Sequence, residues 1–152
     1  KNIIMYGGGL GNKWLSQRCK NLVVIERDGR WLTNDGEYSC IYRPCNDSSG
    51  MDEMYCDIPI KVDVVIVDDA YRYECIVKAL ELPRPLTLIV DNFMQAFVFI
   101  CPAAVELLKD FEGKLYEQEN HEDHDGVNKW KTVYWEFPAK QAKIVQAEFP
   151  VK

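Results

Sequence analysis

The sequence predicts an α/β domain built on a doubly wound, mostly parallel β-sheet. Short, continuous apolar runs alternate along the chain with segments of helical periodicity. The apolar runs lack the strict alternation of strands that face water on one side, so we expect helices on both faces of the sheet. A chain of 152 residues has the usual length of one domain, and we expect residues 1–152 to form a single unit.

The apolar runs give the bounds of the expected parallel strands. These strands are Asn2–Tyr6, Leu22–Ile25, Tyr38–Tyr42, Asp63–Val67 and Thr87–Val90. The segments between or after them predict the helices Lys13–Arg18, Tyr71–Leu82 and Ala103–Phe111. The helix over residues 71–82 repeats apolar residues at helical spacing, and Pro83 and Pro85 follow its end.

The end of the chain has a different period. Lys131–Phe137 alternates between two kinds of side chain, as a strand with two unlike faces does. Together with Lys114–Gln118 it predicts a C-terminal antiparallel hairpin, whose connection is too long for a tight turn. We expect Trp130 and Trp135 to pack against the sheet.

The composition argues against several classes of function. Eighteen basic and twenty-four acidic residues give a net charge of −6, which does not suit binding to a phosphate backbone. No apolar run approaches the roughly 18 residues of a membrane span. Six scattered cysteines without a CxxC pair favour reduced thiols and a cytoplasmic location. We therefore expect a small-molecule or protein substrate and neither a nucleic acid nor a membrane as partner, with a homo-oligomer left open by the apolar residues 93–100.

The first expected strand runs into a glycine-rich loop, Tyr6-Gly7-Gly8-Gly9-Leu10-Gly11. Glycines allow a sharp turn and a close approach of a ligand to the backbone. The second expected strand ends seventeen residues after Gly9, at Glu26, where a carboxylate can accept from two ribose hydroxyls. This pattern predicts a nucleoside-containing cofactor and a Rossmann-like sheet. The dinucleotide pattern G-x-G-x-x-G is incomplete, because Asn12 replaces its third glycine, and no P-loop is present.

Four segments carry a resemblance to a known family. YGGGLGNKW, VVIERDGRW, DVVIVDDAYR and TLIVDN resemble, in order and spacing, the class I S-adenosylmethionine-dependent methyltransferases. WKTVYW resembles the terminal hairpin strand of small members, so the resemblance covers residues 2–137. It implies S-adenosyl-L-methionine as the cofactor and methyl transfer to an oxygen or nitrogen nucleophile.

The resemblance also implies a cofactor site. Its glycines would face the methionine part, its acid after the second strand would hold the ribose, and the two following residues would lie beside the adenosine. The implied residues are Tyr6, Gly7, Gly8, Gly9, Glu26, Arg27, Asp28, Tyr55, Asp57 and Asp68, of which Tyr55 and Asp57 are the adenine candidates. The family often has an acid just before the aromatic residue of the loop, where this chain has Met5.

Two aspartates are the candidate catalytic residues. Asp68 and Asp91 would take up the proton of a nucleophile that must lose one. In the cation-dependent O-methyltransferases, residues at these places bind a divalent metal, so the resemblance also implies Mg²⁺ held by Asp68, Asp91 and Asn92. Relatives without metal use the same Asn to cap a turn, and both interpretations stay open. We expect Asp69 and Arg72 to cap and pair at a helix start.

Three other functions remain open. The domain could bind the cofactor without catalysing methylation, which the absence of an acid at Met5 favours. A nicotinamide-dependent oxidoreductase is disfavoured by Asn12. An aminopropyl transferase would share the fold, although the sequence has no matching acidic gate motif.

Overall fold

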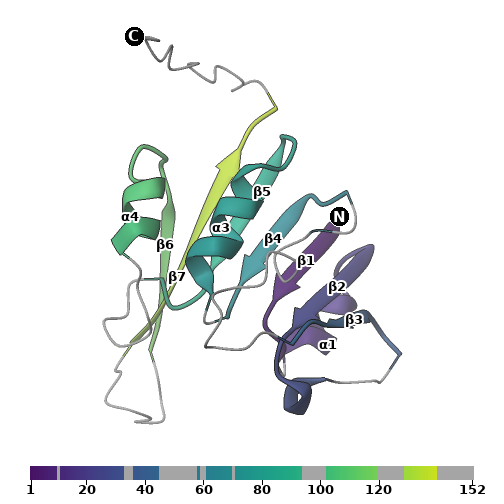
Figure 1. Ribbon diagram of the computed structural model, residues 1–152. Coiled ribbons are helices and arrows are strands. Elements are labelled where there is room, and N and C mark those ends of the chain that lie inside the picture. Colours follow the sequence, from purple (N-terminus) through teal and green to yellow (C-terminus); the bar gives the residue numbers. More distant parts are fainter. Residues whose placement is uncertain are drawn as a thin grey trace, which may run out of the picture.

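The computed structural model describes residues 1–9, 11–32, 36–44, 58, 61–69, 71–93, 102–119 and 129–139. A seven-stranded sheet with the order β3-β2-β1-β4-β5-β7-β6 forms its centre (Figure 1). The first five strands of this order run parallel, and β7 runs antiparallel to both of its neighbours. The doubly wound sheet and its C-terminal antiparallel hairpin are therefore confirmed.

All the expected elements are present. The strands are β1 (Asn2–Tyr6), β2 (Asn21–Glu26), β3 (Ser39–Tyr42), β4 (Val64–Val67), β5 (Leu86–Val90), β6 (Lys114–Glu119) and β7 (Lys129–Phe137). The described helices are α1 (Gly11–Ser16), α3 (Arg72–Leu80) and α4 (Pro102–Leu108), with a 3₁₀ turn, η1 (Gly29–Trp31). Helix α1 starts earlier than predicted because the N–H of Asn12 already donates to the carbonyl of Gly9, at 3.2 Å. None of the described helices has the length and apolar character to cross a membrane.

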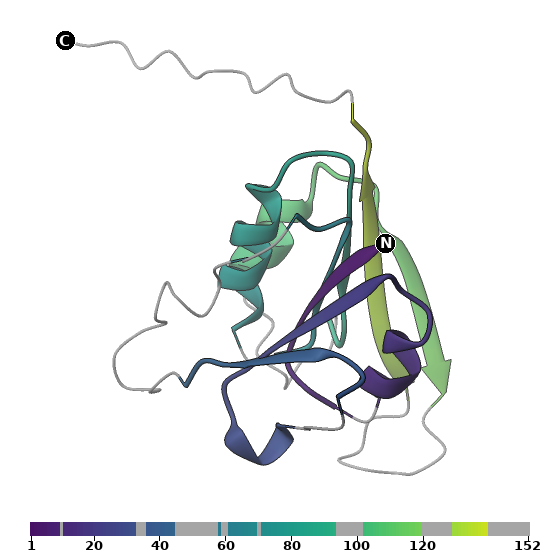
Figure 2. The same cartoon turned by 90° about the vertical axis from the view of Figure 1, so that its right-hand side faces the viewer.

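Helices cover both faces of the sheet. Figure 2 shows α3 and α4 on one side and α1 on the other. Because side chains alternate along a strand, Ile4 and Tyr6 of β1 belong to the core beneath α3 and α4, whereas Ile3 lies in a smaller cluster on the face of α1. Tyr6 is fully buried in the larger core.

The hairpin completes the larger core. Val133, Trp135 and Phe137 of β7 are buried there, as we expected for Trp135. The ring of Trp135 meets the ring of Phe93 edge to face, with centroids 5.2 Å apart. The side chain of Trp130 lies outside the described residues.

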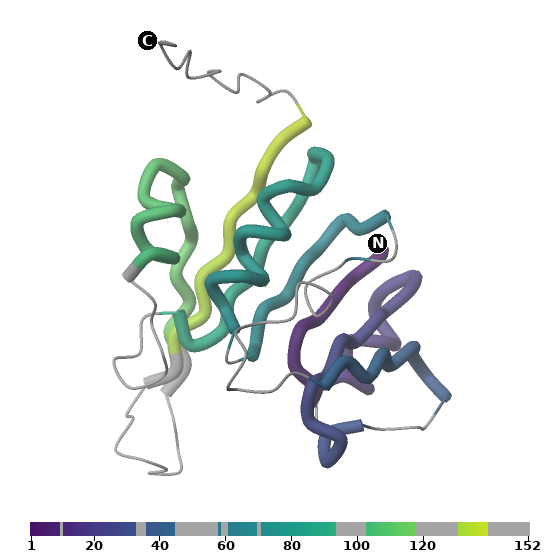
Figure 3. Tube along the Cα trace, in the orientation of Figure 1, coloured from purple at the N-terminus to yellow at the C-terminus, as the bar shows by residue number. Residues whose placement is uncertain are grey.

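The carboxyl ends of the central strands lie level at one edge of the sheet. Tyr6 at the end of β1 pairs with Ile25 of β2 and with Val67 of β4, and Val67 pairs with Val90 of β5. Figure 3 shows these ends on the side away from the N-terminus. The strand order reverses between β1 and β4, and ligands of open α/β sheets bind at such a point.

Candidate functional site

The glycine loop after β1 contains glycines with two different roles. Gly7 has a φ of 89°, and a Cβ at this position would overlap the carbonyl oxygen of Asp68. At Gly8, a Cβ would lie 2.8 Å from Oε2 of Glu26 and 3.1 Å from the carbonyl oxygen of Trp31. The fold itself therefore requires glycine at position 7 and leaves little room for a side chain at position 8, because this loop packs closely against the residues that follow β4 and β2.

Gly9 differs from both. No described atom lies within 4 Å of a Cβ built on Gly9, and its φ is not positive. Neither the packing of the described residues nor the backbone conformation accounts for a glycine there. An open glycine beside two tightly packed ones leaves room for a ligand against the backbone, which fits the predicted cofactor.

Glu26 lies directly behind this loop. Its side chain is 3% exposed, and its two oxygens accept from the N–H groups of Gly8 and Asp28, the latter at 2.7 Å. The carboxylate thus joins the glycine loop to the segment after β2. Each carboxylate oxygen can accept a further hydrogen bond, so a role in holding ribose hydroxyls stays a prediction.

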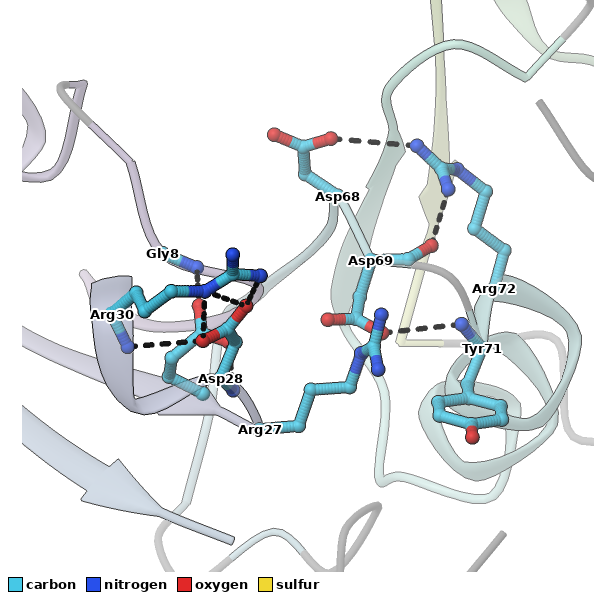
Figure 4. Close-up of polar contacts among 9 residues, drawn as sticks. Gly8, Arg27, Asp28, Arg30, Asp68, Asp69, Tyr71 and Arg72 are labelled. Carbon is cyan, nitrogen blue, oxygen red and sulfur yellow. Dashed lines mark hydrogen bonds and ion pairs between the residues drawn. The ribbon is translucent and has the colours of Figure 1, made fainter. Parts of the chain in front are cut away.

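The two residues after Glu26 point to partners within the protein. Asp28 accepts from the backbone N–H of Arg30 at 3.0 Å and pairs with its guanidinium, which lowers the pKa of Asp28 to about 2. Nε of Arg27 lies 3.3 Å from Oδ1 of Asp69, and its guanidinium lies over the ring of Tyr71 (Figure 4). Arg27 therefore links the end of β2 to the end of β4.

Asp68 follows β4 and lies beside the glycine loop. Its N–H donates to the carbonyl of Tyr6 at 2.9 Å, and its side chain is 38% exposed. Burial raises the pKa of Asp68 to about 6, with a further contribution from the negative charge of Asp91, while Arg72 acts in the opposite direction. A carboxyl group with such a pKa changes its charge near neutral pH.

Arg72 begins helix α3 and is 7% exposed. Its Nε donates to the carbonyl of Asp91 at 3.0 Å. One terminal nitrogen donates to the carbonyl of Asp69, and the other lies 3.4 Å from Oδ1 of Asp68 (Figure 4). The carboxylate of Asp69 accepts from the N–H of Tyr71 at 3.2 Å. The expected capping by Asp69 is wrong, because the N-cap of α3 is Tyr71, which has no side-chain capping bond, and Asp69 closes the turn just before the helix; Arg72 pairs with Asp68.

The residues after β5 form a turn. Oδ1 of Asp91 accepts from the hydroxyl of Thr132 on β7. Asn92 has a φ of 53°, a conformation that Asn tolerates better than most residues, and its buried Oδ1 has no hydrogen-bond partner among the described residues. The observed turn agrees with the interpretation in which Asn92 shapes the backbone.

The predicted Mg²⁺ site finds no support here. Oδ1 of Asp68 faces the guanidinium of Arg72, and Oδ1 of Asp91 accepts from Thr132, so one oxygen of each carboxylate already has a partner within the protein. Across the described part of the chain, no group of three or more His, Cys, Asp or Glu side chains could hold a metal ion.

Two open hollows lie at the other edge of the sheet. One, of about 560 Å³, is lined by Asn2, Asn21 and Lys61 among others, and the second, of about 600 Å³, by Lys1, Asp63 and Leu86 among others. Both therefore lie at the amino ends of the strands. The glycine loop, Asp68, Asp69 and Asp91 lie at the carboxyl ends and do not line either hollow.

Comparisons with known proteins identify the fold. No protein-family model matches the sequence, and no curated protein is similar to it. Among solved structures, a spermidine synthase from Thermotoga maritima aligns with a TM-score of 0.63 and 14% identity over 90% of this chain and 52% of its own. An rRNA methylase from Streptococcus thermophilus aligns with a TM-score of 0.57 and 14% identity over 91% of this chain and 88% of its own. A protein from Streptococcus mutans in complex with SAH aligns with a TM-score of 0.52 and 12% identity over 90% of this chain and 86% of its own.

The chain has the class I methyltransferase fold. It spans about half the length of the spermidine synthase and most of the length of the other two proteins. Identities of this size establish a shared fold, and the reaction has to be argued from the site.

The class I methyltransferase fold brings only part of the predicted site together. Gly7, Gly8, Gly9, Glu26 and Asp68 meet at the carboxyl edge of the sheet. The side chain of Tyr6 lies in the core, so any role of Tyr6 in binding would depend on its backbone. Tyr55 and Asp57 lie outside the described residues.

Sequence reasoning missed two contributors to this edge. Arg72 was expected only to pair at the helix start, although its spacing of four residues from Asp68 is a signal for an ion pair with that residue. Thr132 had no local signal, because its partner Asp91 is 41 residues away.

Proposed function

We propose that this protein is an S-adenosylmethionine-dependent methyltransferase. The observation that carries the proposal is the open backbone at Gly9, in the loop whose Gly7 lies against Asp68 and whose Gly8 donates to the buried carboxylate of Glu26. A nucleoside ribose would lie on the side of Glu26, and an amino-acid moiety along Gly9 toward Asp68. The fold shared with the rRNA methylase, and with the Streptococcus mutans protein in complex with SAH, supports this arrangement.

Bound S-adenosylmethionine would supply an electrophilic methyl group on a sulfonium sulfur. The protein has to align an oxygen or nitrogen nucleophile with that group and exclude competing water. If the nucleophile carries a proton, Asp68 can accept it, because a pKa of about 6 leaves the carboxylate ionised and still basic near neutral pH. Asp91 is the second candidate base, although its bond from Thr132 makes it less accessible to a substrate.

The acceptor is proposed to be a small molecule or a protein. A net charge of −6 argues against a nucleic acid. A cytoplasmic location is part of the proposal, because the six cysteines are scattered along the sequence without a CxxC pair.

Aminopropyl transfer is the second candidate function. It is favoured by the carboxylates of Asp91, Asp69 and Glu26, which all raise the pKa of Asp68 and would attract a cationic amine acceptor. The spermidine synthase shares the fold. Preference for decarboxylated S-adenosylmethionine over the intact form would support this second function.

Calorimetric titration tests the proposal directly. Purified protein is titrated in parallel with S-adenosylmethionine, S-adenosylhomocysteine and NAD, and we expect saturable binding of the two adenosyl ligands. Glu26→Gln keeps the size of the side chain but removes its charge, and should weaken adenosyl binding. A wild-type protein that binds neither adenosyl ligand would refute the proposal, and binding of NAD alone would favour the oxidoreductase.

A further inference from the structure

We propose that Arg72 is a positioning residue, which orients the carboxylate of Asp68 by tying the carboxyl ends of β4 and β5 together. The inference rests on the proposed function, because it assigns Asp68 a ligand to face. It concerns a residue that would not touch that ligand itself.

The contacts of Arg72 are divided between two strand ends. One terminal nitrogen and Nε donate to the carbonyls of Asp69 and Asp91, which follow β4 and β5, and the second terminal nitrogen lies 3.4 Å from Oδ1 of Asp68. Only 8% of the Arg72 side chain is exposed. A buried guanidinium needs such partners, and its planar fork fixes their relative directions.

This arrangement anchors one oxygen of Asp68 and leaves the other available. Within the described residues, Oδ1 faces Arg72 and no hydrogen bond is formed by Oδ2. The two carbonyl contacts fix the guanidinium, so the direction of the carboxylate follows from the position of two strands. Oδ2 is then directed by the protein before any ligand arrives, which is the arrangement that a binding or catalytic carboxylate needs.

Arg72 also balances the charges around Asp68. Asp91, Asp69 and Glu26 each favour the protonated form of Asp68, and Arg72 is the cation that opposes them. Without that cation, three carboxylates would face Asp68 and it would take up a proton at a higher pH. Orientation and charge are separate effects of the same side chain, and they can be separated by substitution.

The experiment compares Arg72→Met, which removes both effects, with Arg72→Lys, which keeps the charge but lacks the planar fork. Affinity for S-adenosylhomocysteine is measured by calorimetry from pH 5 to 8.5, with Asp68→Asn as the reference without a titrating group. Arg84→Met is the matched control, since Arg84 follows the other end of α3, where it donates to the carbonyl of Leu80 and lies over the ring of Phe137. Thermal melting confirms that each variant is folded.

We expect wild-type affinity to fall as the pH falls through about 6. In Arg72→Met the affinity should begin to fall about one pH unit higher than in the wild type, which gives roughly fivefold weaker binding at pH 6. The lost orientation of Asp68 should weaken binding further, and this second loss of affinity should persist at pH 8.5. In Arg72→Lys the affinity should fall at the same pH as in the wild type, but it should remain weaker than that of the wild type at pH 8.5. Arg84→Met should follow the wild type.

A second measurement needs no ligand. The side-chain carboxyl carbon of Asp68, assigned by comparison with Asp68→Asn, is titrated by NMR in the wild type, Arg72→Lys and Arg72→Met. An unchanged Asp68 titration in folded Arg72→Met, or unchanged pH dependence and affinity for S-adenosylhomocysteine, would overturn the role of Arg72. If the wild-type protein binds no adenosyl ligand while the NMR titration shifts as expected, the proposed function fails and the link from Arg72 to Asp68 stands.

Discussion

Replacing Gly9 with alanine separates a ligand-binding glycine from a structural one. No described atom lies within 4 Å of the added Cβ, so the substitution creates no clash within the protein. A Gly→Ala change at a compatible backbone conformation stabilises a protein by about 0.4–1 kcal/mol. We therefore expect Gly9→Ala to melt at the wild-type temperature or slightly above it.

Ligand binding should respond in the opposite direction. A methyl group forced into a close contact costs about 1–3 kcal/mol, and a factor of ten in Kd corresponds to about 1.4 kcal/mol, so affinity for S-adenosylhomocysteine should weaken by about 5- to 150-fold. Gly11→Ala is the matched control, because the space around Gly11 is equally open and the residue belongs to α1. Calorimetry measures both variants. Wild-type affinity in a folded Gly9→Ala protein would refute the idea that the open side of Gly9 faces the cofactor.

Three further predictions follow from the same edge of the sheet. Gly7→Ala should lower the free energy of unfolding by about 2–5 kcal/mol in chemical denaturation, because the cost of the left-handed backbone adds to the cost of the overlap with the Asp68 carbonyl. A loss of stability below about 1 kcal/mol would contradict this packing. Asp68→Asn should raise the melting temperature at pH 8. The pKa of Asp68 is about 6 in the folded protein and 3.8 in the unfolded chain, so ionisation of Asp68 destabilises the folded protein as the pH rises through this window. The gain in melting temperature should vanish below pH 4, and a gain that is constant with pH would exclude titration of Asp68 as its cause. Thr132→Val should cost about 1 kcal/mol of stability through the lost bond to Asp91 and leave S-adenosylhomocysteine binding within about twofold, and a larger binding loss would place Asp91 in the site.

The sequence predicted the strands and their common edge because both depend on local information. Apolar runs are visible in any short window, and the carboxyl ends of parallel strands meet at one edge, so Glu26 and Asp68 were expected there from their positions alone. Alternation along β1 could also have placed the side chain of Tyr6 with Ile4 in the core. Tyr6 was predicted as a cofactor residue from its place in the family's motif alone, and this motif carries no information on which face of the sheet its side chain occupies.

The rest depends on contacts between distant segments. Gly7 and Gly9 look alike in the sequence, and only the position of Asp68, 61 residues after Gly7, gives them different roles. The direction of Arg72 depends on the carbonyl of Asp91, which is 19 residues away and follows the next strand, β5. Such geometry follows from the packing of the whole sheet, which a short sequence window does not contain.

The distribution of charge at this edge points to Asp68 as its chemical centre. Burying a carboxylate is costly unless it is paired or hydrogen-bonded, and the neighbouring acids meet this requirement within the protein. Glu26 accepts from two backbone N–H groups, Asp69 pairs with Arg27, and Asp91 accepts from Thr132. Asp68 is the exception among these four. Within the described residues, the one contact of its side chain is with Arg72, at 3.4 Å, and the side chain remains 38% exposed. The hydrogen bonds and the ion pair of the neighbouring acids hold the loops in place. Asp68 is therefore the carboxylate that the fold leaves available to a ligand.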